Sequence, residues 1–276
     1  MSQRDSTVSG LSGQDWTPLN FQVPGSARVY DCLLGGKDNW DSDRRLVERL
    51  EKTLSTLDLM AHENRAFMER ATHHLVRNHR ITQFLDIGVG LPHGPNLHEV
   101  AQGANMDSRV VYVDNDIHVM AHARALLQGG LPGHLGYLVG DLTKPQEILD
   151  APEMGVLELS RPVALMMLNV LDQIDDDDDP WSNAKVLMDA LPSGSYLVVS
   201  HLGADFYPDQ MHEIAIVCRA EGLTLAPRTH DEVARFFHGW ELLEPGVIPV
   251  MEYWQDGDED ERGFTATYWA GVARKP

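Results

Sequence analysis

Five short apolar runs, most of them separated by segments with a helical pattern, recur along the middle of the chain. Near-continuous apolar strands joined by helical crossovers are typical of a parallel sheet that is covered on both faces, because neither face is open to water. The pattern therefore predicts an α/β fold with a mostly parallel sheet. The expected strands lie at residues 83–88, 109–114, 136–140, 162–170 and 195–201.

The C-terminal part of the chain breaks this alternation. The runs "WELLEPGVIPV" (240–250) and "GFTATYWAGVARK" (263–275) both resemble strands, and the acidic segment "DGDEDERG" joins them. Because no helical pattern lies between the two runs, they predict an antiparallel hairpin at one edge of the sheet.

The chain before the first strand divides into two parts. Residues 1–26 are polar and rich in Ser, Gly and Gln, and we expect them to be a flexible segment. Residues 27–276 are expected to form one domain, in which residues 27–80 are a helical lid or flank and residues 81–276 are the sheet core.

Two helices are predicted in this flank. The first covers "DSDRRLVERLEKTL" and is capped by Asp41 or Ser42. The second covers "DLMAHENRAFMERATHHLVRNH", in which Phe67, Ala71 and Leu75 recur at a spacing of four residues. This spacing places them on one apolar stripe, which is expected to pack against the core.

Charge and cysteine content limit the partners and the compartment. The chain has 22 Lys and Arg against 42 Asp and Glu, a formal charge of -20, which argues against nucleic acid and an anionic membrane as partners. A small cationic or neutral ligand suits this charge, although an acidic balance also simply keeps a protein dispersed. With only Cys32 and Cys218, and no apolar run long enough to span a bilayer, a cytoplasmic protein is expected.

A glycine-containing turn follows the first expected strand in "FLDIGVGLP". Gly88 and Gly90 lie in the turn and Asp86 lies at the end of the strand. In parallel α/β sheets, ligands bind outside the carboxyl ends of the strands, and the first strand-to-helix turn is the usual place. Glycine permits positive φ there and lets a ligand approach the backbone.

The turn does not match a dinucleotide-binding fingerprint. The GxGxxG motif needs a third glycine that packs the helix on the sheet, but Gly94 comes one residue late. Pro92 and Pro95 also interrupt the helix start that would face a pyrophosphate.

Acidic residues follow three consecutive expected strands. Asp114 ends the second strand, where a carboxylate binds ribose hydroxyls, and Asp141 follows the third, where it can accept from an adenine amino group. Together with Asp86 they indicate a ligand with ribose and adenine but little phosphate, and an acidic rim also suits a sulfonium cation. The ordered set favours S-adenosylmethionine over NAD.

Several blocks of the sequence resemble, in order, a bacterial S-adenosyl methyltransferase family that is abundant in actinomycetes and was first catalogued as a domain of unknown function. The resemblance covers residues 24–274 and includes a block, "LLGGKDN", that is not general to methyltransferases. The blocks are "ARVYDCLLGGKDNW", "ENRAFMERA", "QFLDIGVGLP", "VVYVDND", "DDDDDPW", "LPSGSYLVVSH" and "EVARFFHGWELLEPGVIPV".

The resemblance implies a class I methyltransferase fold, with seven strands in the order 3-2-1-4-5-7-6 and the last strand antiparallel. It implies S-adenosylmethionine as cofactor and S-adenosylhomocysteine as product. The positions that match the cofactor site are Asp86, Gly88 and Gly90 for the methionine moiety, Asp114 for the ribose, Asn115, Asp141 and Leu142 for the adenine, and Asn169 to Asp172 near the methyl group.

The family-specific N-terminal blocks are expected to fold over the mouth of the cofactor site. They include Tyr30 and Gly36, and we expect Lys37 or Arg65 to pair with the methionine carboxylate.

A general base is not strictly required, because methyl transfer is an in-line displacement that positioning can accelerate. The candidate bases are His201, Asp172 and Asp31, with His201 preferred because it ends the fifth strand. The alternative for each is an ordinary capping or hydrogen-bonding role. No metal site is expected, since His118 and His122 share a helix face without a further ligand.

We therefore expect a methyltransferase that acts on an unidentified small acceptor by direct methyl transfer. The first alternative is a sensor or partner protein that binds the cofactor without turning it over. The second is a nicotinamide oxidoreductase, which the glycine spacing disfavours. Four aromatic residues near the C-terminus either line an acceptor pocket or, as the favoured interpretation, pack in the core: Trp240, Tyr253, Trp254 and Trp269.

Overall fold

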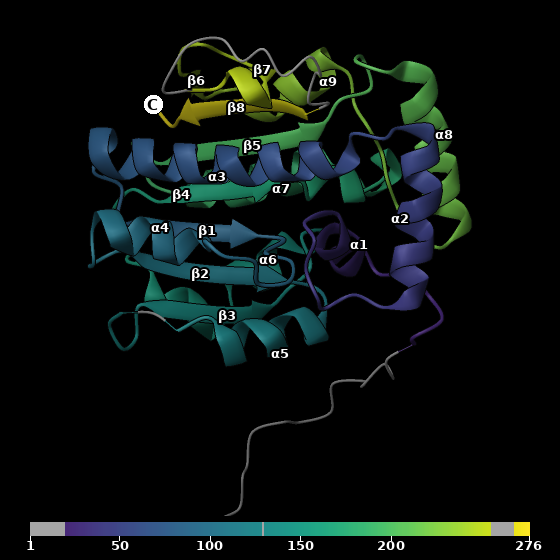
Figure 1. Cartoon of the computed structure of the whole chain (residues 1–276). Coiled ribbons are helices and arrows are strands. Elements are labelled where there is room, and N and C mark those ends of the chain that lie inside the picture. Colours follow the sequence, from purple (N-terminus) through teal and green to yellow (C-terminus); the bar gives the residue numbers. More distant parts are fainter. Residues whose placement is uncertain (1–19, 129, 255–267) are drawn as a thin grey trace, which may run out of the picture.

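The computed structural model describes residues 20–128, 130–254 and 268–276, which build one mixed sheet with helices on both faces (Figure 1). The strands run in the order β3-β2-β1-β4-β5-β8-β6, and β7 pairs with β8. Their bounds are β1 (Gln83–Ile87), β2 (Arg109–Asp114), β3 (Leu135–Val139), β4 (Ala164–Leu168), β5 (Tyr196–Leu202), β6 (Glu241–Leu242), β7 (Ile248–Pro249) and β8 (Tyr268–Arg274).

This topology confirms the predicted fold class. Strands β1 to β5 are parallel, and β8 is inserted antiparallel between β5 and β6. The short strands β6 and β7 together take the place of the expected sixth strand. The acidic segment that precedes β8, and the first residues of the expected last strand, lie outside the described residues.

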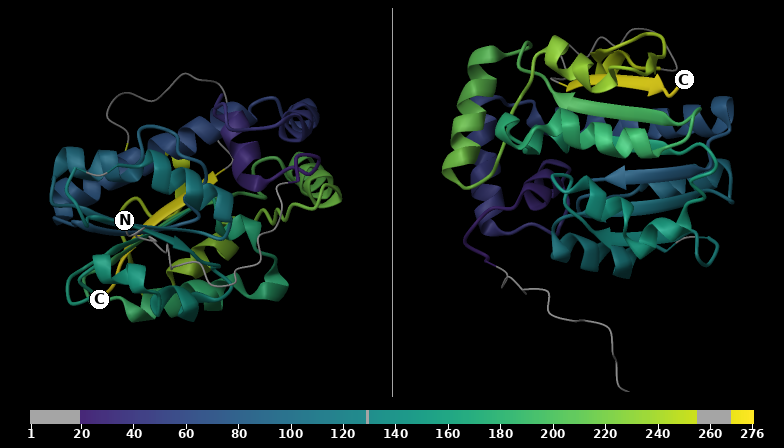
Figure 2. Two further views of the ribbon diagram at one scale, coloured as in Figure 1. Left: turned by 90° about the horizontal axis from the view of Figure 1, so that it is seen from below. Right: turned by 180° about the vertical axis from the view of Figure 1, so that it is seen from behind.

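The helices form two layers, one on each face of the sheet (Figure 2). Buried side chains of α3, α4, α5 and α8 join the core on one face, and those of α6, α7 and α9 join the core on the other. The bounds are α1 (Ser26–Leu33), α2 (Asp41–Thr53), α3 (Leu57–His79), α4 (Leu97–Ala104), α5 (Ile117–Leu126), α6 (Pro145–Leu149), α7 (Pro180–Ala190), α8 (Pro208–Ala220) and α9 (His230–Ala234). Short 3-10 helices are η1 (Pro152–Val156), η2 (Leu171–Gln173), η3 (Asp176–Asp178), η4 (Arg235–Phe237) and η5 (Val250–Glu252).

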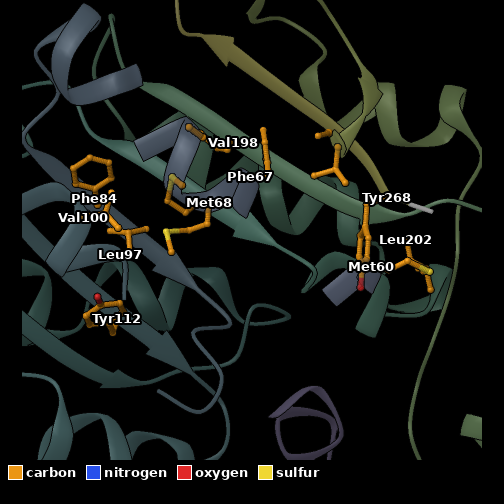
Figure 3. Packing of buried hydrophobic residues seen from close by; sticks show 14 of the residues in the cluster. Met60, Phe67, Met68, Phe84, Leu97, Val100, Tyr112, Val198, Leu202 and Tyr268 are labelled. Carbon is orange, nitrogen blue, oxygen red and sulfur yellow. The ribbon is translucent and has the colours of Figure 1, made fainter. Parts of the chain in front are cut away.

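The long helix α3 packs along the sheet with the stripe that the sequence predicts. Phe67, Ala71 and Leu75 are fully buried, and Figure 3 shows Phe67 and Met68 beside Val198 of β5. The expected helices at 41–54 and 58–79 are thus confirmed as α2 and α3. Helix α1 was not expected, because the sequence indicates only a short apolar patch before Gly35.

Helices α1, α2 and α8 lie beyond the carboxyl ends of the parallel strands (Figure 1). They therefore face the edge of the sheet at which the glycine turn and the three acidic residues emerge. Among the described helices, none is long and apolar enough to cross a membrane.

Two leucines of α3 test how much this layer contributes to stability. Leu75 is fully buried, whereas Leu59 is 43% exposed. We expect Leu75→Ala to lower the free energy of unfolding by about 2–5 kcal/mol, because it removes buried methyl groups and leaves a cavity. Leu59→Ala is the matched control on the same helix and should cost less than about 1 kcal/mol. Urea unfolding followed by circular dichroism measures both, and equal losses would contradict the packing of α3.

Candidate active site

A cavity of about 490 Å³ lies at the carboxyl ends of the central strands. This volume falls in the usual range of small-molecule sites, about 300–1,000 Å³. Its walls come from the loops after β1, β2, β3 and β4, from α1 and α3, and from residues 222–224 after α8.

The glycine turn forms the floor of the cavity. Gly88 has a φ of 76°, and a Cβ there would lie 2.5 Å from a methyl carbon of Val170, so a side chain cannot fit. Gly90 has a φ of 66° and nothing within 4 Å of the Cβ position, which leaves its backbone open to the cavity. The Gly90 N–H donates to Asp114 Oδ2 at 2.9 Å and so ties the turn to the end of β2.

Asp86 is the most isolated of the acidic groups in the cavity. Its side chain is 8% exposed, and no described residue donates a hydrogen bond to its carboxylate. Burial raises the pKa of Asp86 to about 7, although the nearby Arg65 guanidinium opposes this shift and Asp114 adds to it. The group therefore changes charge near neutral pH.

Backbone hydrogen bonds hold the other two predicted carboxylates. Asp114 accepts from the Asp116 N–H at 3.0 Å as well as from Gly90, and burial still raises its pKa. Asp141 accepts from the N–H and the hydroxyl of Thr143 through Oδ1, at 2.9 and 2.8 Å. These bonds orient both side chains and leave the second oxygen of Asp141 for a ligand.

The loop after β4 packs against the glycine turn and forms the next part of the cavity wall. Asn169 has a φ of 54°, a left-handed conformation that costs energy for a residue other than glycine. Its N–H donates to the Ser200 carbonyl at 3.0 Å, and Gln173 Nε2 donates to its carbonyl at 2.9 Å. These two bonds hold the strained backbone at the cavity wall.

The cavity brings together ten of the predicted site residues and leaves five aside. The residues that line it are Tyr30, Arg65, Asp86, Gly88, Gly90, Asp114, Asn115, Asp141, Leu142 and Asn169. The residues that do not line it are Gly36, Lys37, Asp31, Asp172 and His201.

Asp31 and Gly36 build the loop after α1. Asp31 Oδ2 accepts from the Asp38 N–H at 3.0 Å and from Asn39 Nδ2 at 2.8 Å. A Cβ on Gly36 would lie 2.0 Å from Asp31 Oδ1, so glycine is required for the loop to close over this carboxylate. Lys37 is exposed and points its charge to solvent rather than lining the cavity.

His201, the preferred base of the sequence analysis, is fully buried beside Arg228. Arg228 Nη1 lies 2.8 Å from His201 Nε2, and His201 Nδ1 lies 2.9 Å from the Leu202 carbonyl. Because a guanidinium only donates, Nε2 must accept and Nδ1 must carry the proton. Burial and the Arg228 charge lower the pKa of His201 to about 3. This neutral imidazole accepts a hydrogen bond from Arg228 and is a poor base.

Arg228 in turn holds the loop that follows β4. Its guanidinium donates to the carbonyls of Leu171 and Ile174, each at 2.8 Å, and to Asp176 at 2.7 Å. The same loop supplies Gln173 and Ile174 to the cavity wall. His201 and Arg228 thus act on the site through this loop.

Asp172 lies in the same loop and is fully buried. Its Oδ2 accepts from the Leu202 N–H at 3.3 Å, while Oδ1 has no hydrogen-bond partner among the described residues. Burial raises its pKa to about 6, against the effects of the Leu202 bond and Arg228. Its neighbour Gln173 lines the cavity, whereas Asp172 itself lies behind the wall.

Sequence reasoning missed several lining residues. Asn64 and Met68 come from α3, where they lie one turn apart. Both belong to the block "ENRAFMERA", which carries part of the family resemblance. Residues 222–224 have no signal in the sequence, because only the packing of α8 against α2 brings them to the cavity. The four C-terminal aromatic residues do not line it; for example, Trp254 stacks on His74 at 3.6 Å between ring centroids.

Comparisons with known proteins identify the family of the chain. A family model described as S-adenosyl methyltransferase matches residues 12–276. A solved DUF574 family protein from Streptomyces avermitilis is 39% identical, with a TM-score of 0.89 over 93% of this chain and 99% of that one. A candidate methyltransferase from Thermobifida fusca is 38% identical, with a TM-score of 0.86 over 95% and 99% of the two chains.

Solved structures with lower sequence identity share only the fold with this chain. A SAM-dependent methyltransferase from Anabaena variabilis is 13% identical, with a TM-score of 0.51 over 95% of this chain and 100% of that one. No curated protein matches the chain. The family model spans nearly the whole sequence, and it confirms both the resemblance and S-adenosylmethionine as the cofactor. The chain therefore belongs to the S-adenosyl methyltransferase family.

Proposed function

We propose that this methyltransferase moves the methyl group of S-adenosylmethionine directly to a small-molecule acceptor in the cavity described above. One observation carries the proposal: carboxylates from the ends of three neighbouring strands converge with an open glycine turn on one cavity of about 490 Å³. Each of these groups has a counterpart in the chemistry of the cofactor.

The nucleoside half of the cofactor matches the loops after β2 and β3. Asp114 is oriented by two backbone N–H groups, and its carboxylate suits the two hydroxyls of a ribose. The free oxygen of Asp141 suits an adenine amino group, and the buried side chain of Leu142 offers an apolar contact for the ring. Gly90 leaves room for the ligand to lie against the backbone.

The charges of the cavity match the other half of the cofactor. S-adenosylmethionine supplies an electrophilic methyl group on a positively charged sulfur, and it also carries an ammonium group and a carboxylate. Arg65 is the one Lys or Arg side chain among the described lining residues. The lining carboxylates are Asp86, Asp114, Asp116, Asp141 and Asp178. This excess of negative charge favours a cationic ligand.

Positioning supplies most of the proposed rate enhancement. The wall of Asn169, Gln173 and Ile174 is held by backbone bonds and by Arg228, so an acceptor placed against it meets a rigid surface. Asp172 is buried behind this wall and does not line the cavity, so the proposed displacement uses no protein base in direct contact with the acceptor.

A non-catalytic cofactor-binding protein is the second candidate. It is favoured by one observation: the described lining residues include no histidine, lysine or cysteine, and Asp172 lies behind the wall. Turnover of the methyl donor with a small acceptor distinguishes the two functions, because a sensor binds S-adenosylmethionine without consuming it.

Calorimetric titration tests the cofactor site. We expect micromolar binding of S-adenosylmethionine and S-adenosylhomocysteine and no binding of NADH. Asp114→Ala should weaken both adenosyl ligands at least tenfold, because charged hydrogen bonds contribute about 1.5–3 kcal/mol each. Asp107 is exposed and lies just before the first residue of β2. The control variant Asp107→Ala should therefore bind both adenosyl ligands normally. Failure of both adenosyl ligands to bind the unaltered protein would refute the proposal.

The pKa of Asp86 predicts a pH dependence of affinity. Asp86 is neutral below a pH of about 7 and anionic above it, while Arg65 and Asp114 are the charged groups that face it. Of the two ligands, only S-adenosylmethionine carries the sulfonium charge that an anionic Asp86 attracts. The ratio of S-adenosylmethionine affinity to S-adenosylhomocysteine affinity should therefore rise about tenfold from pH 6 to pH 8, which corresponds to about 1.4 kcal/mol. Asp86→Asn should flatten this rise in the same titrations. An equally steep rise in the variant would show that another group is responsible.

A further inference from the structure

A chain of hydrogen bonds crosses the roof of the cavity and joins three separate elements. The Tyr30 hydroxyl of α1 lies 3.1 Å from the Ala61 carbonyl, and Asn64 Nδ2 of α3 lies 2.9 Å from the Tyr30 hydroxyl oxygen. Asn64 Oδ1 lies 2.5 Å from the Ser200 hydroxyl of β5. Tyr30 and Asn64 both line the cavity.

The Ala61 carbonyl decides the direction of the whole chain. A carbonyl only accepts, so the Tyr30 hydroxyl must donate to it and its oxygen must accept from Asn64. The Asn64 atom next to Tyr30 is therefore the amide nitrogen, and its oxygen must face Ser200, which donates. Burial raises the pKa of Tyr30 to about 12, so the phenol keeps its proton and the direction does not reverse near neutral pH.

One amide hydrogen of Asn64 is left over. The side chain is 3% exposed, the amide nitrogen makes one hydrogen bond with the described residues, and the amide plane is held from both sides. An amide nitrogen has two hydrogens, so the second is a donor without a partner among the described residues, on a side chain that lines the cavity. Such a donor is costly unless a ligand accepts from it.

The charges indicate which ligand group meets this donor. Arg65, the next residue of α3, is held in place by the carbonyls of His93 and Pro95, each 2.6 Å from its Nη2. The other charged side chains of the described lining are all carboxylates, which repel an anion. A ligand carboxylate is therefore accommodated best beside Arg65 and Asn64.

We propose that the second amide hydrogen of Asn64, together with Arg65, binds the methionine carboxylate of S-adenosylmethionine. The proposal rests on the proposed function, since it assigns a residue to that same site. Tyr30 is then a positioning residue, because it orients the Asn64 amide from the lid helix α1. Ser200 does the same from β5.

The test compares S-adenosylhomocysteine with decarboxylated S-adenosylhomocysteine, which keeps the adenosine, thioether and amine. Calorimetry gives the preference of each variant for the carboxylate-bearing ligand. Asn64→Leu should lower this preference at least tenfold, because it removes a hydrogen bond to a charged group. Asn64→Asp keeps the shape and the acceptor for Ser200 but places a second carboxylate there, so it should reverse the preference.

Two further variants separate orientation from general damage. Tyr30→Phe should lower the preference less than Asn64→Leu, because the donor remains but loses one of its two holding bonds. Asn78→Leu, an exposed position on the same helix, should leave the preference unchanged. Circular dichroism confirms that each variant is folded.

The outcomes are distinct. An unchanged preference in both Asn64 variants overturns the assignment. An equal loss of affinity for both ligands also overturns it, because the effect would not depend on the carboxylate. If Asn64→Leu binds both ligands normally but loses turnover, the second amide hydrogen would bind the methyl acceptor and not the methionine carboxylate, which overturns the proposal. If the unaltered protein binds neither ligand, the proposed function fails first, and the inference fails with it.

Discussion

The parallel pairing of β1 with β2 and β4 is the constraint on which the site depends. It brings the carboxyl ends of these strands to one edge, so that Asp86, the glycine turn and Asp114 meet although 28 residues separate the two acids. The N–H groups of Gly88 and Val89 both donate to the Val113 carbonyl, which continues the pairing into the turn. This part of the cavity is thus an extension of the sheet, and α1, α3 and residues 222–224 supply the remaining walls.

The same edge holds carboxylates in two different environments. Asp114 and Asp141 accept hydrogen bonds from the backbone and are held in one orientation. Asp86 has no such partner among the described residues, and burial raises its pKa although the Arg65 guanidinium opposes the shift. The surroundings of each aspartate therefore decide whether its carboxylate is held by backbone hydrogen bonds or has its pKa raised without such bonds.

Buried polar contacts support the site from behind. Arg228 donates hydrogen bonds to Leu171, Ile174 and Asp176 of the loop after β4 and a further one to His201. Asp31 closes the loop that follows α1. Histidine and aspartate at the ends of elements look alike in a sequence whether they face a cavity or a buried arginine, which is why these residues were predicted to be bases.

The sequence by itself determined the fold class, the strand ends and the acids that line the cavity, because apolar periodicity and turn residues are local properties of the chain. It did not indicate the further polar residues of the wall, such as Asn64 and Gln173. Tyr30, Asn64 and Ser200 are far apart in sequence, and only the packing of α1 and α3 over β5 brings them into one hydrogen-bond chain. Residues 222–224 reach the cavity for the same reason. Contacts between distant segments follow from how whole elements pack, which local patterns do not encode.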